Sequence, residues 1–201
     1  NLQRNIDDAF LRRIGVAVNV IAPDEEQRRR IWQLVFPAEA PVEDLDLETP
    51  FGAPSSPVRL GTLAGRRVAF LARHGRHHTY LPSEVPYRAS VYALRMLGVR
   101  QALGVSAVGS LREAYEPRHV VVLDQLVDRT HRRLGTFFGD GVVAHVGFAD
   151  PFCEGLRGAL GQGADAAGLT VHVRGTYLNM EGPQFSTRAE SRIHQASGCD
   201  V

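Results

Sequence analysis

Residues 175–190 read GTYLNMEGPQFSTRAE, and this stretch carries the clearest fold signal in the chain. Thr176–Met180 is typical of a short strand, and Ser186–Gln195 has the composition of a helix. A rigid Gly182–Pro183 turn lies between them and is followed by Phe185, whose ring is suited to stacking on a planar base. From the residues alone, Phe185 is more typical of a protein core, so a ligand-binding role is only one of two interpretations.

The segments before this stretch also alternate between strand-like and helix-like patterns. Strands are predicted at Arg67–Leu71, Ala102–Val105, His119–Val127 and Thr170–Arg174, and helices at Tyr87–Leu97 and Leu156–Ala167. Such alternation indicates an α/β layered sheet with flanking helices.

Composition narrows the classes of function. The formal net charge of +1 favours neither nucleic acid nor an acidic membrane as a partner. No apolar run approaches the length of a membrane span, and no signal-peptide pattern opens the chain. Cys153 and Cys199 lie far apart, so we expect neither a disulfide framework nor a zinc site, and a cytoplasmic setting follows. Every basic residue is arginine, which excludes a Schiff-base or Walker A lysine.

A basic segment, RHGRHH at Arg73–His78, follows the strand predicted at Arg67–Leu71. Ligands of α/β folds bind beyond the carboxyl ends of strands, and arginine offers forked donors to a phosphate. The segment therefore favours an anion site. Two alternatives are a solvated basic loop and a metal cluster of His74, His77 and His78. No carboxylate accompanies these imidazoles, and the neighbouring arginines would repel a cation.

Two further segments are weaker candidates. SAVGS at Ser106–Ser110 has small residues that let backbone amides approach an anion or a sugar, although a tight packing turn explains it equally well. His145 lies in VAHVGFADPF and is more typical of a structural histidine than of a functional one.

Taken in this order, LARHGRHH, SAVGSLRE and GTYLNMEGPQFSTRAE resemble the S-methyl-5'-thioadenosine phosphorylases, a branch of the trimeric purine nucleoside phosphorylases. The resemblance runs from about Glu48 to Val201 and implies a truncated purine nucleoside phosphorylase-like layered sheet. It implies phosphorolysis of S-methyl-5'-thioadenosine to adenine and 5-methylthioribose 1-phosphate. Inorganic phosphate would be the co-substrate, with no cofactor and no metal.

The resemblance also assigns roles to particular residues. In similar enzymes the RH pair, here Arg73 and His74, binds phosphate, and the loop serine, here Ser106 with the Ala107 amide, lies against phosphate and ribose. The phenylalanine of EGPQF, here Phe185, flanks the purine. Ser186 after it favours methylthioadenosine over inosine or guanosine, which stay as alternatives.

Two histidines receive roles in the same way. His145 is expected to reach from one subunit into the 5'-pocket of the next, which implies a homotrimer. His78 is expected to face the phosphate or the ribose. The resemblance assigns no catalytic residue.

Residues 1–47 resemble a different family, the AAA-type ATPases, from the arginine-finger helix to the start of the lid, with Arg12 or Arg13 as the finger. The acidic run Glu43–Asp46 is predicted to be a linker to a second domain at residues 48–201. No phosphate loop, lysine or magnesium-binding strand accompanies the finger, so no ATP site is expected. Arg12 and Arg13 are then expected to form a solvated helix face.

The phosphorylase pattern is also interrupted at both ends. The glycine-rich loop that opens similar enzymes is replaced by the ATPase-like segment, and the sequence stops at Gly198–Val201, before the segments that hold ribose and select the base. We therefore expect a weak or inactive phosphorylase from this polypeptide. The alternatives are a non-catalytic oligomerising remnant of the fold and, third, an ATPase regulator acting through Arg12 or Arg13.

Overall fold

The computed structural model describes residues 43–201, so Arg12, Arg13 and nearly all of the ATPase-like prediction lie outside the described residues. The chain divides into two compact units. The larger unit consists of Glu43–Leu60 and Val68–Val201, and the described part of the smaller unit is Gly61–Arg67. The candidate site lies in the larger unit.

The acidic run predicted to be a linker instead contributes a strand. β1 (Glu43–Leu45), β2 (Val58–Leu63) and β3 (Arg66–Phe70) form a sheet in that order, and β1 runs antiparallel to β2. Asp44 stands directly opposite Arg59, and its two carboxylate oxygens accept hydrogen bonds from Nε and Nη2 of that guanidinium, both at 2.8 Å. Opposite charges across a strand pair stabilise it. β3 confirms the strand predicted at Arg67–Leu71 to within one residue.

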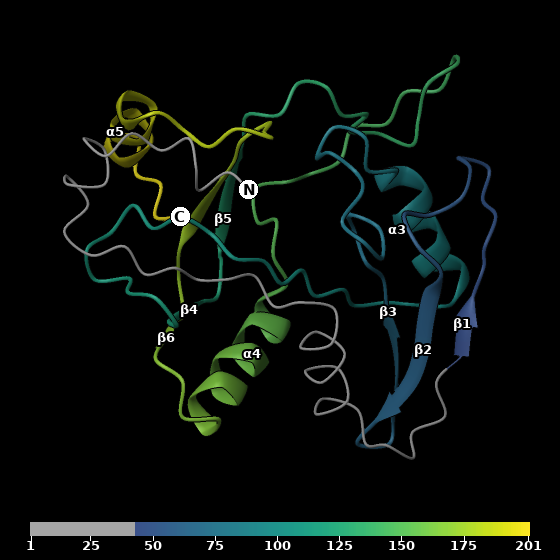
Figure 1. Ribbon diagram of the computed structural model, residues 1–201, viewed down its shortest axis with the longest axis horizontal. Helices are drawn as coiled ribbons and strands as arrows, with labels where there is room; N and C mark the ends of the chain where they lie inside the picture. The colour runs from purple at the N-terminus through teal and green to yellow at the C-terminus, as the bar shows by residue number, and fades with distance from the viewer. Residues whose placement is uncertain (1–42) are drawn as a thin grey trace, which may run out of the picture. The chain divides into compact units, whose positions relative to one another are not determined.

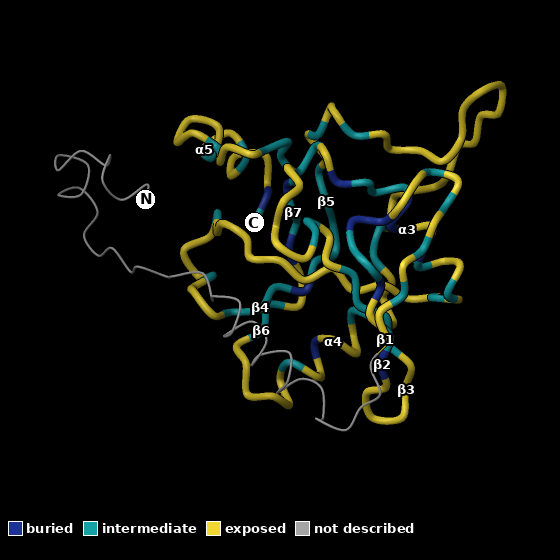
Figure 2. Tube along the Cα trace, turned by 45° about the vertical axis from the view of Figure 1, so that its right-hand side comes forward, coloured by how far each residue is buried: buried dark blue, intermediate teal, exposed yellow. Residues whose placement is uncertain are grey.

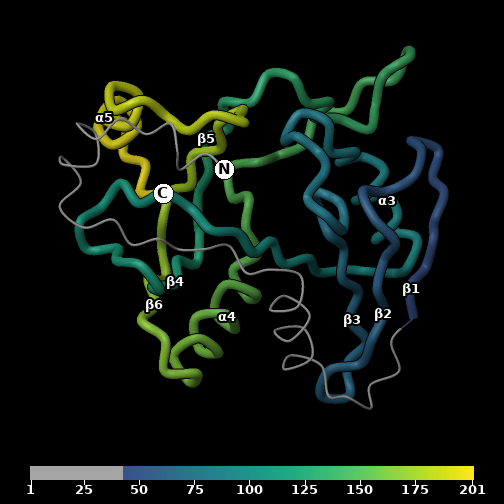
Figure 3. Tube along the Cα trace, viewed as in Figure 1, coloured from purple at the N-terminus to yellow at the C-terminus, as the bar shows by residue number. Residues whose placement is uncertain are grey.

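Two parallel strand pairs follow in the second half of the chain. β4 (Val120–Val121) pairs with β6 (Val171–His172), and Figure 3 shows them side by side although some fifty residues separate them. β5 (Gln125–Asp128) pairs with β7 (Thr176–Asn179), with Asp128 opposite Asn179. α4 (Glu154–Ala166) precedes β6 and packs against it (Figure 1). Parallel strands joined through a helix are the predicted α/β arrangement.

Two strand predictions are wrong in detail. The single strand expected at His119–Val127 is divided into β4 and β5, because the chain changes partner from β6 to β7 between them. Asp124 marks the change: its amide donates to the Gly175 carbonyl at 3.2 Å, and its Oδ1 accepts from the Gly175 amide at 3.0 Å. The strand expected at Ala102–Val105 does not form. Residues 101–110 are exposed throughout and pair with no strand within residues 43–201.

The three helices predicted within residues 43–201 are confirmed, with small shifts at their ends, whereas the helices predicted before residue 43 lie outside the described residues. The confirmed helices are α3 (Tyr87–Met96), α4 and α5 (Arg188–Ala196). α5 begins two residues later than predicted, because Thr187 caps it. The Thr187 hydroxyl accepts from the Glu190 amide at 3.2 Å, and the Glu190 carboxylate accepts from the Thr187 amide at 2.7 Å. This reciprocal capping box satisfies two amides that the first turn leaves without a partner.

The C-terminal residues form hydrogen bonds with the backbone of β7. The Leu178 amide donates to the Val201 carbonyl at 2.8 Å, and the Asp200 amide donates to the Thr176 carbonyl at 2.9 Å. Leu178, Cys199 and Val201 are accordingly buried, whereas the long connections are exposed (Figure 2). Among residues 43–201, no helix is both long and apolar enough to cross a membrane.

Candidate functional site

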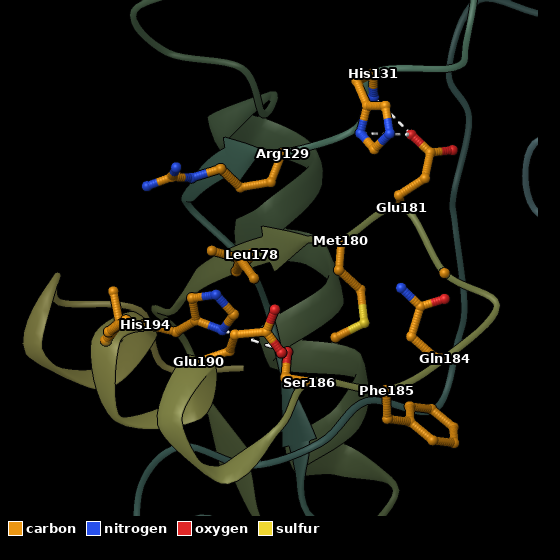
Figure 4. Close-up of a pocket in the computed structure, with 12 residues that line it drawn as sticks. Arg129, His131, Leu178, Met180, Glu181, Gln184, Phe185, Ser186, Glu190 and His194 are labelled. Atoms are coloured by element: carbon orange, nitrogen blue, oxygen red, sulfur yellow. Dashed lines mark hydrogen bonds and ion pairs between the residues drawn. The ribbon is translucent and has the colours of Figure 1, made fainter.

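A pocket of about 370 Å³ lies at the carboxyl ends of β5 and β7. Phe185 and Ser186, both predicted from the sequence, line it together (Figure 4). The Phe185 side chain is 90% exposed, so its ring is free to meet a ligand. Open α/β sheets bind their ligands beyond the carboxyl ends of their strands, where this pocket is found.

α5 supplies one wall of the pocket. His194 lies on this helix with its Nδ1 at 3.5 Å from the Ser186 hydroxyl, and Glu190 lies beside them (Figure 4). The Thr187 backbone amide donates to the Glu190 carboxylate, and this hydrogen bond, followed by one with the Thr187 side chain, holds the pKa of the Glu190 carboxyl below its usual range. The wall therefore combines a carboxylate, an imidazole and a hydroxyl around the end of the EGPQF segment.

Glu181 lies at the opposite end of the pocket, where its carboxylate is bound by backbone amides. Its Oε2 accepts from the amides of His131 at 2.6 Å and Arg132 at 3.0 Å. The His131 amide is the main cause of a lowered pKa for the Glu181 carboxyl, which outweighs the opposing effect of burial. Glu181 is therefore held ionised.

The basic segment forms a compact turn. The imidazole of His74 donates from Nδ1 to the Tyr80 carbonyl at 3.0 Å, which leaves its Nε2 available to a ligand. The rings of His74 and His78 stack with centroids 4.6 Å apart. Arg73 is exposed, and among residues 43–201 its guanidinium forms no ion pair or hydrogen bond. The structure thus brings His74 and His78 together, with Arg73 adjacent in sequence.

The turn is tied to the pocket through Pro82 and Gly182. Gly182 has a φ of +72°, and a Cβ at this position would lie 3.2 Å from Cγ of Pro82. Tyr87 holds Pro82 from the other side, because its hydroxyl donates to the Pro82 carbonyl at 2.9 Å. The chain that carries His74 therefore passes directly beside the chain that carries Phe185.

The other three predicted residues are Ser106, Ala107 and His145. Within residues 43–201 no hydrogen bond or ion pair brings them to the pocket or to the turn that holds His74. Ser106 and Ala107 lie in the exposed loop of residues 101–110, and His145 lies in an exposed stretch at residues 134–150. Within the described part of the chain, no hydrogen bond or ion pair joins Ser106 or Ala107 to Arg73 or His74.

Several residues of the pocket were not predicted from the sequence. They are Arg129, His131, Met180, Gln184, Glu190 and His194. Three of them, Met180, Gln184 and Glu190, belong to the GTYLNMEGPQFSTRAE stretch, so this stretch was itself the usable signal. Arg129 and His131 line the pocket because β5 pairs with β7. The local sequence pattern does not show this pairing.

Among residues 43–201, no group of three or more His, Cys, Asp or Glu side chains is arranged to hold a metal ion. His74 and His78 are stacked ring on ring, a geometry in which the two imidazoles do not converge on one point.

Comparisons with known proteins give consistent matches over most of the chain. Residues 32–201 match the family model described as Phosphorylase superfamily. An S-methyl-5'-thioadenosine phosphorylase of Koribacter versatilis is 51% identical over 166 residues, which cover 83% of this chain and 57% of the relative. The chain therefore spans little more than half the length of that curated relative.

Two solved structures extend the match to three dimensions. A methylthioadenosine phosphorylase from an antarctic soil metagenomic library superposes with a TM-score of 0.80 at 47% identity, covering 84% of this chain and 60% of that one. The methylthioadenosine phosphorylase from Schistosoma mansoni in complex with adenine gives a TM-score of 0.77 at 36% identity, covering 83% of this chain and 68% of that one.

Proposed function

The chain belongs to the phosphorylase superfamily, and we propose that its activity is the phosphorolysis of S-methyl-5'-thioadenosine. In this reaction a phosphate oxygen bonds to C1' of the sugar as the bond from C1' to adenine breaks. Adenine leaves with the electron pair and takes up a proton, and 5-methylthioribose 1-phosphate remains. Because positive charge develops on the sugar, the protein's task is to position phosphate and to bind the departing base.

One observation carries the proposal: Phe185 and Ser186 line the same pocket at the ends of two paired parallel strands. A lining that includes an aromatic ring and a hydroxyl suits a planar purine, and about 370 Å³ lies within the range of small-molecule sites. The relatives named above support adenine as that purine. Neither the pocket nor its lining favours inosine or guanosine.

Phosphate is proposed to bind at the turn that holds Arg73 and His74. The exposed guanidinium of Arg73 offers forked donors. His74 uses its Nδ1 proton on the Tyr80 carbonyl, so Nε2 accepts from a protonated phosphate oxygen or, in the imidazolium form, donates to an unprotonated one. Ser106, Ala107 and His78 are proposed as further contacts to phosphate or ribose.

We also propose a homotrimer in which His145 reaches a neighbour's pocket, in a cytoplasmic setting. Support comes from the exposed stretch at residues 134–150, where Val143 and Val146 are 79% and 77% exposed. Sedimentation velocity tests the assembly: a trimer is expected, and a monomer at all concentrations would contradict this part of the proposal.

Calorimetric titration of adenine into this chain tests the base site. We expect Phe185→Ala to weaken binding about tenfold or more, because base–aromatic stacking contributes about 1–3 kcal/mol. Val91→Ala is the control, since Val91 is also exposed, lies on α3 and does not line the pocket. Equal affinities for the three proteins would contradict the assignment.

Release of adenine from S-methyl-5'-thioadenosine tests the reaction itself. We expect release to depend on added phosphate and to produce the sugar 1-phosphate in equal amount. Release without phosphate would indicate hydrolysis, and preferential turnover of inosine would transfer the proposal to the alternative substrate.

A further inference from the structure

We infer that Glu181 is a positioning residue that locks the chain leaving β5 to the chain leaving β7, and thereby sets the shape of the pocket. The identity of the ligand in this inference rests on the proposed function. The locking itself is a property of the described contacts and does not depend on a ligand.

The side chain of Glu181 reaches across from one segment to the other. Its Oε2 accepts from two consecutive amides, those of His131 at 2.6 Å and Arg132 at 3.0 Å. Its Oε1 lies 3.6 Å from Nε of Arg133, and this buried oxygen has no hydrogen-bond partner. One carboxylate thus engages three successive residues of the segment after β5.

Arg133 reaches back across the same gap. Its Nη2 donates to the carbonyl of Glu181 at 3.0 Å and to that of Met180 at 3.4 Å. Its guanidinium also lies over the ring of Tyr87, 5.2 Å from the centroid, at the start of α3. Arg133 therefore contacts both the backbone and the side chain of Glu181. Arg133 is itself packed on Tyr87, which belongs to a third segment.

The place of this lock explains why it would matter to the pocket. β5 and β7 remain paired as far as Asp128 and Asn179, and the Arg129 amide still donates to the Asn179 carbonyl at 2.9 Å. Beyond that point no backbone hydrogen bond joins the two segments within the described residues. Arg129 and His131 line the pocket from one chain, and Phe185 lines it from the other.

Burial makes the lock sensitive to the loss of either partner. The Glu181 side chain is 9% exposed and the Arg133 side chain 15%. Removing one member of a buried pair leaves an uncompensated charge on the other, which costs more than the loss of an exposed pair. The two amides would also lose their acceptor.

Amide hydrogen exchange, measured by NMR without ligand, tests the lock. In the wild type we expect the amides of His131 and Arg132 to be protected, and in Glu181→Ala we expect both to exchange about tenfold faster or more. Glu181→Gln keeps an oxygen that can accept from both amides and is expected to retain most of the protection. Glu154→Gln is the control, since that carboxylate is 85% exposed on α4.

Adenine affinity, measured on the same proteins, tests the consequence for the pocket. We expect Glu181→Ala to weaken adenine binding about tenfold and Glu181→Gln to restore most of it, with exchange in α4 and β6 unchanged. A merely structural role predicts faster exchange in α4 and β6 as well. The inference is overturned by that result, by protected amides in Glu181→Ala, or by adenine affinity that does not follow the protection.

The two proposals fail in different ways. Failure of the wild type to bind adenine would count against the proposed function. Amide exchange at His131 and Arg132 would still decide whether Glu181 locks the two segments. If Glu181→Ala does not fold, the same exchange measured in Glu181→Gln decides the question.

Discussion

Gly182 packs directly against the ring of Pro82: a Cβ on Gly182 would lie 3.2 Å from Cγ of the proline. This approach brings the segment of Phe185 against the segment that follows His74, so the proposed base and phosphate sites meet where Gly182 lies beside the Pro82 ring. The glycine also has a φ of +72°, a conformation that other L-residues adopt only with strain.

Gly182→Ala should therefore destabilise the protein, by about 1–3 kcal/mol from left-handed strain and the crowded proline. Urea unfolding followed by circular dichroism measures the change. Gly158→Ala is the matched control, because Gly158 lies within α4 with open space around it, and there alanine should stabilise by about 0.5–1 kcal/mol. Equal effects of the two substitutions would show that the Pro82 contact is unimportant.

Asp44 should make folding stability depend on pH in the acid range. Hydrogen bonds and ion pairs with Arg59, and then with Arg76, lower its pKa from 3.8 to about 2. Because the folded-state pKa is depressed, the stabilisation is complete above the unfolded value and is lost as pH falls through the window from 3.8 to about 2.

The matched variant is Asp44→Asn. The difference in unfolding free energy between wild type and variant should be constant near neutrality, shrink across that window, and weaken in 1 M salt, where the Debye length is about 3 Å. A difference that stays constant down to the lowest pH would contradict the assignment.

Thr187→Ala should destabilise α5 by about 1 kcal/mol, because it removes one half of the capping box. Thr187→Ser keeps the hydroxyl and should cost much less. Since α5 carries the His194 side of the pocket, adenine affinity should fall with the alanine variant alone. Faster exchange of the Glu190 amide in that variant is the direct measurement, and unchanged exchange would show that the cap is dispensable.

Phosphate binding should depend on both Arg73 and His74. Arg73→Ala is expected to weaken it about tenfold or more, because a hydrogen bond to a charged group contributes about 1.5–3 kcal/mol. His74→Asn keeps a donor for the Tyr80 carbonyl but has nothing in the place of Nε2, so it should weaken phosphate without opening the turn.

Titration followed by phosphorus NMR gives the affinities. Arg95→Ala, which removes an equal charge from the last turn of α3, serves as the control. If Arg95→Ala and Arg73→Ala weaken binding equally, phosphate responds only to net charge and the turn is not its site.

The helices and the strand before EGPQF could be predicted because their local patterns are strong. α3, α4, α5 and β7 all appear within two residues of the expected bounds. The split of His119–Val127 could not be predicted, because Asp124 changes strand partner only in the folded sheet. β1 was missed for a similar reason: its acidic residues become a strand through Arg59, which lies opposite Asp44.

The candidate site shows the same division. Phe185 and Ser186 were named through the resemblance to a known family, and both line one pocket. The role inferred for Glu181 could not be predicted, because its partners are the amides of His131 and Arg132, some fifty residues earlier. The residue types do not show which backbone amides will bind a carboxylate. Ser106 and Ala107 were singled out by their small-residue loop and by the resemblance, and their place in the site stays a prediction.

The most direct test of the central claim uses the two methionines of the chain, Met96 and Met180. Met180 lines the pocket, whereas Met96 is 54% exposed at the end of α3. With methyl-labelled methionine, adenine should shift the Met180 signal through the ring current of the bound base and leave Met96 unmoved. Saturable movement of Met180 alone is the result the account predicts. Movement of Met96 alone, or of neither signal at saturating adenine, would contradict adenine binding in this pocket.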